Sequence, residues 1–322
     1  MNKNYKGIVL CGGLGKRMNS DIPKALHKIF DKCIAEYVVN SMMKAGINDI
    51  CMVIGHKAEM VKEYFKDYQN ISYAYQKELL GTGHAVMQAT NFISKDDNIL
   101  VINGDMPLIS AESISDFITY FEENNYAACA LTAILDDPFG YGRIIRYGDN
   151  LFKKIVEQKD ASESEKEIKE VNLGVYLYNG KELLTSLSKL TNNNAQGEYY
   201  ITDTLYHILL DNKLVGAYTL KESLESKNVN SREELAEAAK TMFLRTNKMH
   251  MQNGVTIIDP NNTYISQDSV IGKDTIIYPG TQIRGKSVIG ENCIIECSNI
   301  INSTIKPGTH ILSFSNVVND MV

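Results

Sequence analysis

Isoleucine recurs at every sixth position near the end of the chain. The uninterrupted series is Ile265, Ile271, Ile277, Ile283, Ile289, Ile295 and Ile301. A half-buried strand repeats every two residues and a helix every 3.6, so a period of six fits neither. It is typical of a hexapeptide β-helix, in which the repeated side chain points inward and stacks on its copies. We expect the phase to slip near Pro307, with Ile305, Ile311 and Val317 in one more partial coil.

Short apolar runs alternate with amphipathic stretches in the preceding part of the chain. The pattern predicts strands at 6–11, 49–54, 71–75, 98–102, 127–134 and 171–178, and helices at about 34–46, 57–68, 83–92 and 111–124. This alternation favours an open α/β sheet that is parallel at least in its first half. Ligands of such sheets bind outside the carboxyl ends of the strands.

Composition excludes several classes of protein. The net charge of −6 disfavours a general nucleic-acid surface. Six cysteines are scattered without a CxxC pair, which suits a reducing cytoplasm better than a disulfide scaffold or a zinc site. No run of 18 apolar residues and no signal peptide is present, so we expect a cytoplasmic protein without a membrane partner.

A glycine-rich turn follows the first predicted strand. Gly12, Gly13 and Gly15 come directly after the apolar run, and Lys16, Arg17 and Lys24 follow them. Glycines let backbone N–H groups approach a ligand closely, and such groups can cradle an anion. Lysine and arginine add positive charge for phosphate oxygens. The spacing matches neither GxxxxGK[ST] nor GxGxxG, but the combination still predicts a triphosphate-binding loop.

Two further stretches carry polar groups just after predicted strands. Gln76 precedes Gly81-Thr82-Gly83, where Thr82 is expected to cap a helix and a carboxamide can read the edge of a base. Asn103-Gly104-Asp105 ends the apolar run NILVI. Since Mg²⁺ prefers one or two protein oxygens together with phosphate and water, Asp105 is the first expected metal ligand.

The pattern GGxGxRMx(4)PK at 12–24 resembles the signature of sugar-1-phosphate nucleotidyltransferases. It is most similar to the uridylyltransferase half of the bifunctional N-acetylglucosamine-1-phosphate uridylyltransferase / glucosamine-1-phosphate acetyltransferase family. The stretches QKELLGTGHA, GDMPL, DPFGYGRI, IVEQKDA and TNNNAQGEYYITD are also similar to that family. Lys16, Asn103 and Leu173 depart from its pattern, where threonine, tyrosine and threonine are usual.

The resemblance implies a role for each matched residue. Arg17 and Lys24 would be catalytic, and Asp105 and Asn230 would hold Mg²⁺. The nucleotide would be bound by Leu10, Cys11, Gly12, Gly13, Gln76, Gly81, Thr82, Asn103, Gly104 and Asp105. The sugar phosphate would be bound by Gly140, Glu157, Asn172, Tyr200, Thr202 and Asn230. Asn230 or Ser231 alone reads equally well as an ordinary helix cap.

The resemblance also implies the domain plan and the reaction. A Rossmann-like nucleotidyltransferase domain with a mixed, mostly parallel sheet would span 1–235, a linker helix 236–253, and a short left-handed parallel β-helix 254–322. The enzyme would join UTP and N-acetylglucosamine-1-phosphate into UDP-N-acetylglucosamine, a cell-envelope precursor. We expect no acetyltransferase activity, because this β-helix is shorter than that of the family, and we expect a homotrimer through it. The alternatives are another sugar-1-phosphate as substrate, or a non-catalytic subunit that senses sugar nucleotides.

Overall fold

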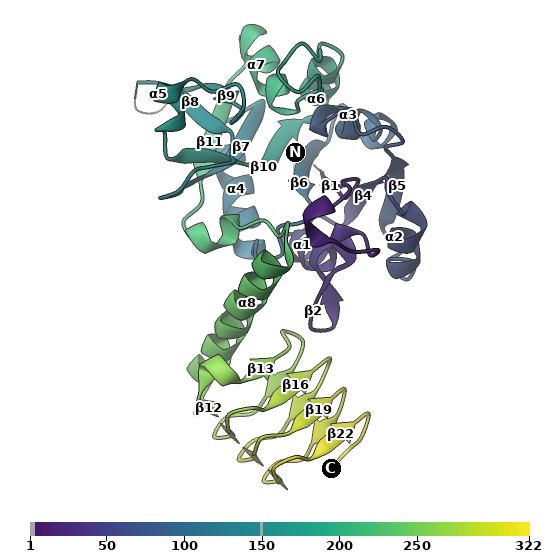
Figure 1. Cartoon of the computed structure of the whole chain (residues 1–322), viewed down its shortest axis with the longest axis vertical. Coiled ribbons are helices and arrows are strands. Elements are labelled where there is room, and N and C mark those ends of the chain that lie inside the picture. The colour runs from purple at the N-terminus through teal and green to yellow at the C-terminus, as the bar shows by residue number, and fades with distance from the viewer. Residues whose placement is uncertain (1–3, 149–150) are drawn as a thin grey trace. The chain divides into compact units, whose positions relative to one another are not determined.

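The computed structural model describes residues 4–148 and 151–322, which form two compact units (Figure 1). The first unit comprises Met1–His27 and Ile34–Asn230, and the second comprises Lys28–Cys33 and Ser231–Val322. No helix among these residues is long and apolar enough to cross a membrane.

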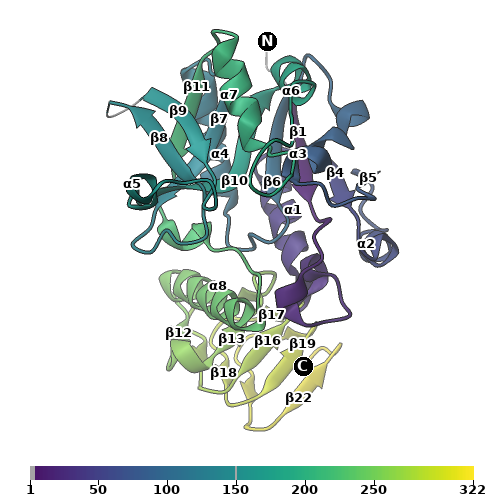
Figure 2. The ribbon, with the colours of Figure 1, turned by 45° about the horizontal axis from the view of Figure 1, so that its top comes forward.

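A nine-stranded mixed sheet forms the centre of the first unit (Figure 2). Its main path runs β11-β7-β10-β6-β1-β4-β5, and β8 pairs with β10 and β9. The strands are β1 (Tyr5–Leu10), β4 (Asp49–Ile54), β5 (Ile71–Tyr75), β6 (Asn98–Asn103), β7 (Ala128–Ile134), β8 (Arg143–Tyr147), β9 (Leu151–Val156), β10 (Glu170–Asn179) and β11 (Val215–Thr219). The predicted mixed, mostly parallel sheet is confirmed, since only the pairings of β10 and β8 are antiparallel.

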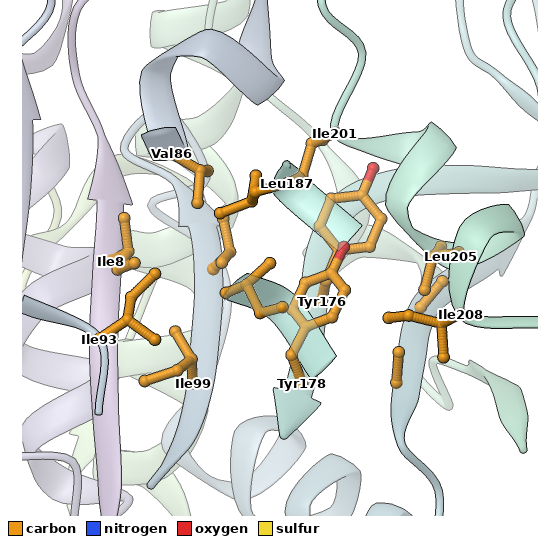
Figure 3. Packing of buried hydrophobic residues seen from close by; sticks show 14 of the residues in the cluster. Ile8, Val86, Ile93, Ile99, Tyr176, Tyr178, Leu187, Ile201, Leu205 and Ile208 are labelled. Atoms are coloured by element: carbon orange, nitrogen blue, oxygen red, sulfur yellow. The ribbon is translucent and has the colours of Figure 1, made fainter. Parts of the chain in front are cut away.

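Helices cover the sheet and bury its apolar side chains. They are α1 (Ile34–Lys44), α2 (Ala58–Tyr64), α3 (Thr82–Met87), α4 (Ala111–Glu123), α5 (Glu163–Lys166), α6 (Gly180–Leu187) and α7 (Thr202–Leu210), with short 3₁₀ turns η1 (Lys16–Met18) and η2 (Lys24–Leu26). Tyr176 and Tyr178 of β10 lie inside one core cluster with Leu205 and Ile208 of α7 (Figure 3). Both phenol rings are fully enclosed, so this face of β10 packs against α7.

The second unit begins with α8 (Arg232–Gln252) and continues as stacked coils. Three parallel sheets, one per side, form the coils. They are β12 (Thr256–Ile257), β15 (Ile276–Ile277), β18 (Ile294–Ile295) and β21 (His310–Ile311); β13 (Tyr264–Ile265), β16 (Gln282–Arg284), β19 (Asn299–Ile301) and β22 (Asn316–Val318); and β14 (Val270–Ile271), β17 (Val288–Ile289) and β20 (Thr304–Ile305). The predicted short parallel β-helix is confirmed.

The position of the phase slip in the β-helix was predicted wrongly. Ile265 through Ile295 point into the core as expected, but the next inward residue is Ile300, which is fully buried, whereas Ile301 is partly exposed. Ile300 pairs with Ile283, and Ile305 pairs with Ile289. The inward positions are therefore five residues apart on either side of Ile300, because the corners there are shorter by one residue. The slip precedes Pro307, and Ile305 and Ile311 continue the core as predicted.

A hairpin from early in the chain completes the second unit. It consists of β2 (Lys28–Ile29) and β3 (Lys32–Cys33). At its tip the Phe30 ring contacts the ring of Phe243 in α8 at a centroid distance of 4.4 Å. The Asp31 carboxylate accepts hydrogen bonds from Arg284 Nη2 at 2.9 Å and from Gly285 N at 2.8 Å. Aromatic packing and a charge-assisted hydrogen bond thus join the tip to the coils.

Candidate active site

A cavity of ≈ 280 Å³ lies at the carboxyl ends of the central strands. Here β1 is flanked by β6 on one side and by β4 on the other, so the order of strands reverses at this point. Leu10 ends β1 directly beside Asn103, which ends β6. Such a switch point is where open α/β sheets bind their ligands. The cavity is lined by Leu10, Cys11, Gly12, Gly13, Lys24, Ala25, Gln76, Leu79, Gly81, Thr82, Ala85, Asn103, Gly104, Asp105 and Glu198.

Gly12 of the predicted phosphate loop and Gly104 after β6 allow close approach of neighbouring chain segments. A Cβ added at Gly12 would come 2.9 Å from Gln76 Oε1, and one added at Gly104 would come 2.4 Å from Cys11 Sγ. A side chain at either position would force Gln76 or Cys11 to move, so glycine allows this close packing. The loop after β1 therefore packs directly on the residues that follow β5 and β6.

Lys24 joins the two predicted metal ligands. Its Nζ donates hydrogen bonds to Asp105 Oδ2 and, at 2.9 Å, to Asn230 Oδ1. Only about a fifth of the Lys24 side chain and an eighth of the Asp105 side chain are exposed, at 20% and 12%. A cation of the protein itself thus lies between an acidic and an amide oxygen, which shows that both oxygens can contact one positive centre.

Backbone interactions bring Asn230 to the end of β6. The N–H of Val229 donates to the carbonyl oxygen of Asp105 at 2.8 Å. Ser231 is the N-cap of α8, and its Oγ accepts from the N–H of Glu234 at 3.1 Å. The capping role belongs to Ser231, as one of the two alternatives from the sequence had it, and this leaves the Asn230 side chain directed at Lys24.

Residues predicted to read the base surround the start of α3. Gln76 is buried, and its Nε2 donates to the carbonyl oxygen of Gly81 at 3.0 Å. Thr82 is not the N-cap that we expected: Gly81, with φ of +105°, occupies that position. The Thr82 hydroxyl instead accepts from the N–H of Ile201 at 3.2 Å. Thr82 therefore fastens the segment before α7 to the cavity wall.

The structure does not bring Arg17 into this cavity. Arg17 lies on η1, directly after the glycine turn, and is exposed. Conversely, sequence reasoning missed Ala25, Leu79, Ala85 and Glu198 as lining residues. Leu79, Ala85 and Glu198 fall within stretches already quoted for their resemblance. The apolar side chains among the four carry no chemical signal of their own.

Four of the residues predicted to hold the sugar phosphate lie around strand β10 and the start of α7. They are Glu157, Asn172, Tyr200 and Thr202. The Thr202 hydroxyl donates to Glu157 Oε1 at 3.3 Å, and the Tyr200 hydroxyl accepts from Gln196 Nε2 at 2.9 Å. Burial raises the pKa of the Glu157 carboxyl above its ordinary value, and the Thr202 hydrogen bond opposes this only in part. The Gly140 N–H donates to Gln158 Oε1 at 3.2 Å, in an exposed turn.

A β-bulge in β10 separates Asn172 from Tyr176. The register between β10 and β7 shifts between Asn172 and Tyr176, and Gly174 within the shift has φ of +73°. Asn172 Nδ2 donates to the Tyr176 hydroxyl at 2.7 Å. A Cβ at Gly174 would come 2.3 Å from Asn103 Nδ2, so the bulge touches the lining of the cavity. Tyr176 was missed, because an aromatic residue in a strand is typical of a core.

The residues at the end of β6 can bind a divalent cation only if a bound phosphate and water supply the remaining coordinating oxygens. Asp105 Oδ1 is buried without a hydrogen-bond partner among the described residues. No group of three or more histidine, cysteine, aspartate and glutamate side chains in residues 4–148 and 151–322 could hold a metal by itself. One carboxylate and one amide oxygen match Mg²⁺, which takes its remaining ligands from phosphate and water.

Comparison with known proteins places these observations in a family. Residues 6–242 match the nucleotidyl transferase family, and residues 268–303 match the bacterial transferase hexapeptide family (six repeats). The chain is 48% identical over 310 residues to the bifunctional protein GlmU of Clostridioides difficile (strain 630), covering 96% of this chain and 67% of that protein. It is 48% identical over 299 residues to the bifunctional protein GlmU of Clostridium kluyveri, covering 92% and 65%.

The chain thus spans about two thirds of the length of these curated relatives. Among solved structures, it resembles a 2.76 Å crystal structure of a putative glucose-1-phosphate thymidylyltransferase from Bacillus anthracis in complex with a sucrose. The TM-score is 0.60 at 21% identity, covering 73% of this chain and 94% of that chain. At this identity the likeness concerns the fold.

Proposed function

Because this chain belongs to the nucleotidyl transferase family, we propose that it transfers the uridylyl group of UTP to N-acetylglucosamine-1-phosphate. An oxygen of the sugar phosphate attacks the α-phosphorus of UTP in line. The new O–P bond forms as the bond to the β-phosphate oxygen breaks, and pyrophosphate leaves. The products are UDP-N-acetylglucosamine and pyrophosphate. The proposal is supported by the 48% identity to bifunctional GlmU proteins and by the arrangement at the end of β6.

The single observation that carries the proposal is the grouping of Lys24, Asp105 and Asn230 beside the glycine loop. The attacking phosphate is already anionic, so the reaction needs no side-chain nucleophile. It needs positioning and the neutralisation of phosphate charge. The loop N–H groups and Lys24 hold the triphosphate, and Arg17 approaches it from η1 when the nucleotide is bound.

Asp105 and Asn230 would hold Mg²⁺, which neutralises phosphate charge and orients the attacking and accepting groups when it is bound. Gln76, Gly81 and Thr82 form the wall that faces the uracil. Glu157, Asn172, Tyr200 and Thr202 offer acceptors and donors to the sugar hydroxyls, with Gly140 in the neighbouring turn. This separation puts the base at the start of α3 and the sugar at the bulge of β10, with the phosphates between them.

A substrate panel tests the proposed reaction. Pyrophosphate release is measured with Mg²⁺ for each pairing of UTP, dTTP, CTP, ATP and GTP with N-acetylglucosamine-1-phosphate, glucosamine-1-phosphate and glucose-1-phosphate. We expect UTP with N-acetylglucosamine-1-phosphate to have the highest kcat/KM. Faster turnover of another pair would replace the substrate assignment, and binding of a sugar nucleotide without turnover of any pair would indicate a sensing subunit.

Asp105→Asn tests the role of the carboxylate while keeping its shape. Loss of one negative charge at the metal position should lower kcat by about two or more orders of magnitude. Asp116→Asn, at a partly exposed site on α4 where the carboxylate pairs with Lys221, is the matched control and should keep normal turnover. Normal turnover of Asp105→Asn would remove the metal assignment.

The β-helix enters the proposal in two ways. We propose that hexapeptide coils assemble three copies of the chain, which sedimentation velocity tests directly: a monomer at micromolar concentration would contradict it. The chain spans about two thirds of the length of the bifunctional relatives, and acetyl transfer is not part of the function that we propose for it. Release of free coenzyme A from acetyl-CoA in the presence of glucosamine-1-phosphate would add that activity to the proposal.

A further inference from the structure

Lys24 occupies the position that the proposed function gives to a divalent cation. Its ammonium contacts Asp105 Oδ2 and lies 2.9 Å from Asn230 Oδ1, the two oxygens that would bind the metal. An ammonium and a divalent cation repel each other and cannot share these oxygens at hydrogen-bond distance. Any cation that binds there must therefore displace the lysine head group.

The position of Asp105 explains this pairing. Asp105 follows a buried strand, and its side chain is only 12% exposed. A carboxylate in such a place is costly unless it is paired. Asp105 Oδ1 already lies buried without a hydrogen-bond partner among the described residues. The ammonium of Lys24 compensates the charge that would otherwise be left at the end of β6.

A bound nucleotide would offer the Lys24 ammonium other hydrogen-bond acceptors. The stem of Lys24 lies close to the backbone of Gly15, since a Cβ added at Gly15 would come 2.9 Å from Lys24 Cβ. Its head group is carried on a flexible four-carbon chain, and it lines the same cavity as the glycine loop. Triphosphate oxygens held by that loop would give the ammonium new acceptors within the cavity.

Resting on the proposed function, we propose that Lys24 is an internal counter-ion that keeps the metal position closed until nucleotide phosphates draw it away. The divalent cation and the nucleotide then bind as one unit, and a bare cation binds weakly to the free protein. Lys24 therefore acts before the reaction, in addition to holding phosphate during it.

The test measures Mn²⁺ binding to the full chain without nucleotide, by electron paramagnetic resonance of free Mn²⁺. Lys24→Met removes the charge and keeps most of the side-chain length. We expect it to bind Mn²⁺ about tenfold more tightly than the unmodified protein, the equivalent of one lost charge-assisted hydrogen bond. Lys24→Arg, which keeps a positive charge, should bind as weakly as the unmodified protein, and so should the exposed control Lys95→Met.

Thermal unfolding checks that Lys24→Met is folded. Without metal, Lys24→Met should have a lower Tm than the unmodified protein, because Asp105 loses its partner, and saturating Mn²⁺ should raise the Tm of Lys24→Met more. Equal Mn²⁺ affinity of Lys24→Met and the unmodified protein would overturn the counter-ion proposal.

Asp105→Asn distinguishes a failure of the counter-ion proposal from a failure of the proposed function. The proposed metal site stands if Asp105→Asn weakens Mn²⁺ binding measured with UTP present, whatever Lys24→Met does. If Asp105→Asn binds Mn²⁺ as tightly as the unmodified protein under both conditions, the metal assignment itself is wrong, and the counter-ion proposal is overturned with it.

Discussion

The Glu157 carboxyl lies in surroundings that favour its neutral form. Burial raises its pKa, and the Thr202 hydroxyl only partly offsets the effect. A raised pKa in the folded state means that the protein binds more protons than the unfolded chain between the ordinary and the raised value. The contribution of Glu157 to the free energy of unfolding is therefore most favourable below the ordinary value near 4.5. It is lost as the pH rises through the raised pKa.

Glu157→Gln should therefore become more stable relative to the unmodified protein as the pH rises. The amide carries no charge at any pH, but it keeps an oxygen that can accept from Thr202. The Tm difference between the two proteins, measured from pH 4 to pH 8, should shift in favour of the variant as the pH rises from the ordinary value to the raised pKa, and stay constant above it. Glu123→Gln, at an exposed position, should give a constant difference, and a flat difference for Glu157→Gln would contradict the assigned burial effect.

Tyr176→Phe should weaken sugar binding indirectly, through Asn172, because Tyr176 itself is not one of the proposed sugar ligands. Removing the hydroxyl leaves Asn172 Nδ2 without its acceptor at 2.7 Å, which costs about 1–3 kcal/mol in a buried site and frees the amide to turn. The KM for the sugar phosphate should rise while the KM for UTP stays the same. Tyr178→Phe is the matched control, since its hydroxyl pairs with Thr204 instead. An equal rise for both variants would indicate a general loss of packing.

Residues that follow strands were the most predictable part of the site. Gln76 and Asp105 stand where a parallel sheet exposes its carboxyl ends, so position alone marked them. Thr82 and Tyr176 show where this reasoning stops. The role of Thr82 depends on Ile201, which is far away in sequence, and the role of Tyr176 depends on a bulge in its own strand. Local propensity predicts neither.

At the scale of elements, the central strands of the sheet were predictable because they are continuous apolar runs, and the coils because their six-residue period is strict. The strands β8, β9 and β11 were missed, since they alternate weakly or are short. The exchange of Ile301 for Ile300 in the coil core has a similar origin. Both residues are isoleucine, so the sequence continues its period through a corner where the backbone has lost one residue.

Ile300→Ala and Ile301→Ala separate the two registers. Ile300 is fully buried, so its truncation should cost about 2–5 kcal/mol and speed hydrogen exchange in β16, β19 and β22. Ile301 is partly exposed, so its truncation should cost clearly less. Hydrogen–deuterium exchange at equal denaturant concentration makes the comparison, and a larger effect at Ile301 would restore the unbroken six-residue period.

At the scale of the whole molecule, neither composition nor hydrophobic periodicity predicts the hairpin at Lys28–Cys33. Its two strands have two residues each, too few to show alternation. Its assignment to the second unit follows from partners more than 200 positions away, such as Phe243 and Arg284. The domain limits at 235 and 253 stay predictions, and a boundary drawn at one point of the chain could not have included this hairpin.

Asp31→Asn should destabilise the second unit although it lies in the first tenth of the chain. The substitution removes the charge that pairs with Arg284 and weakens the bond from Gly285 N, which together are worth about 1–3 kcal/mol. Proteolysis of the coils under partly denaturing conditions should speed up. Asp21→Asn, whose side chain is fully exposed, is the control, and equal cleavage rates for the two variants would contradict the assignment.

The hairpin also sets an order of events during synthesis. Phe30 leaves the ribosome 213 residues ahead of Phe243, the ring against which it comes to rest. At elongation rates of about 5–20 residues per second, the tip waits roughly 10–40 s with its aromatic side chain uncovered. The nascent chain therefore passes through a long interval in which an early aromatic tip is open to chaperones, and only translation of α8 ends it.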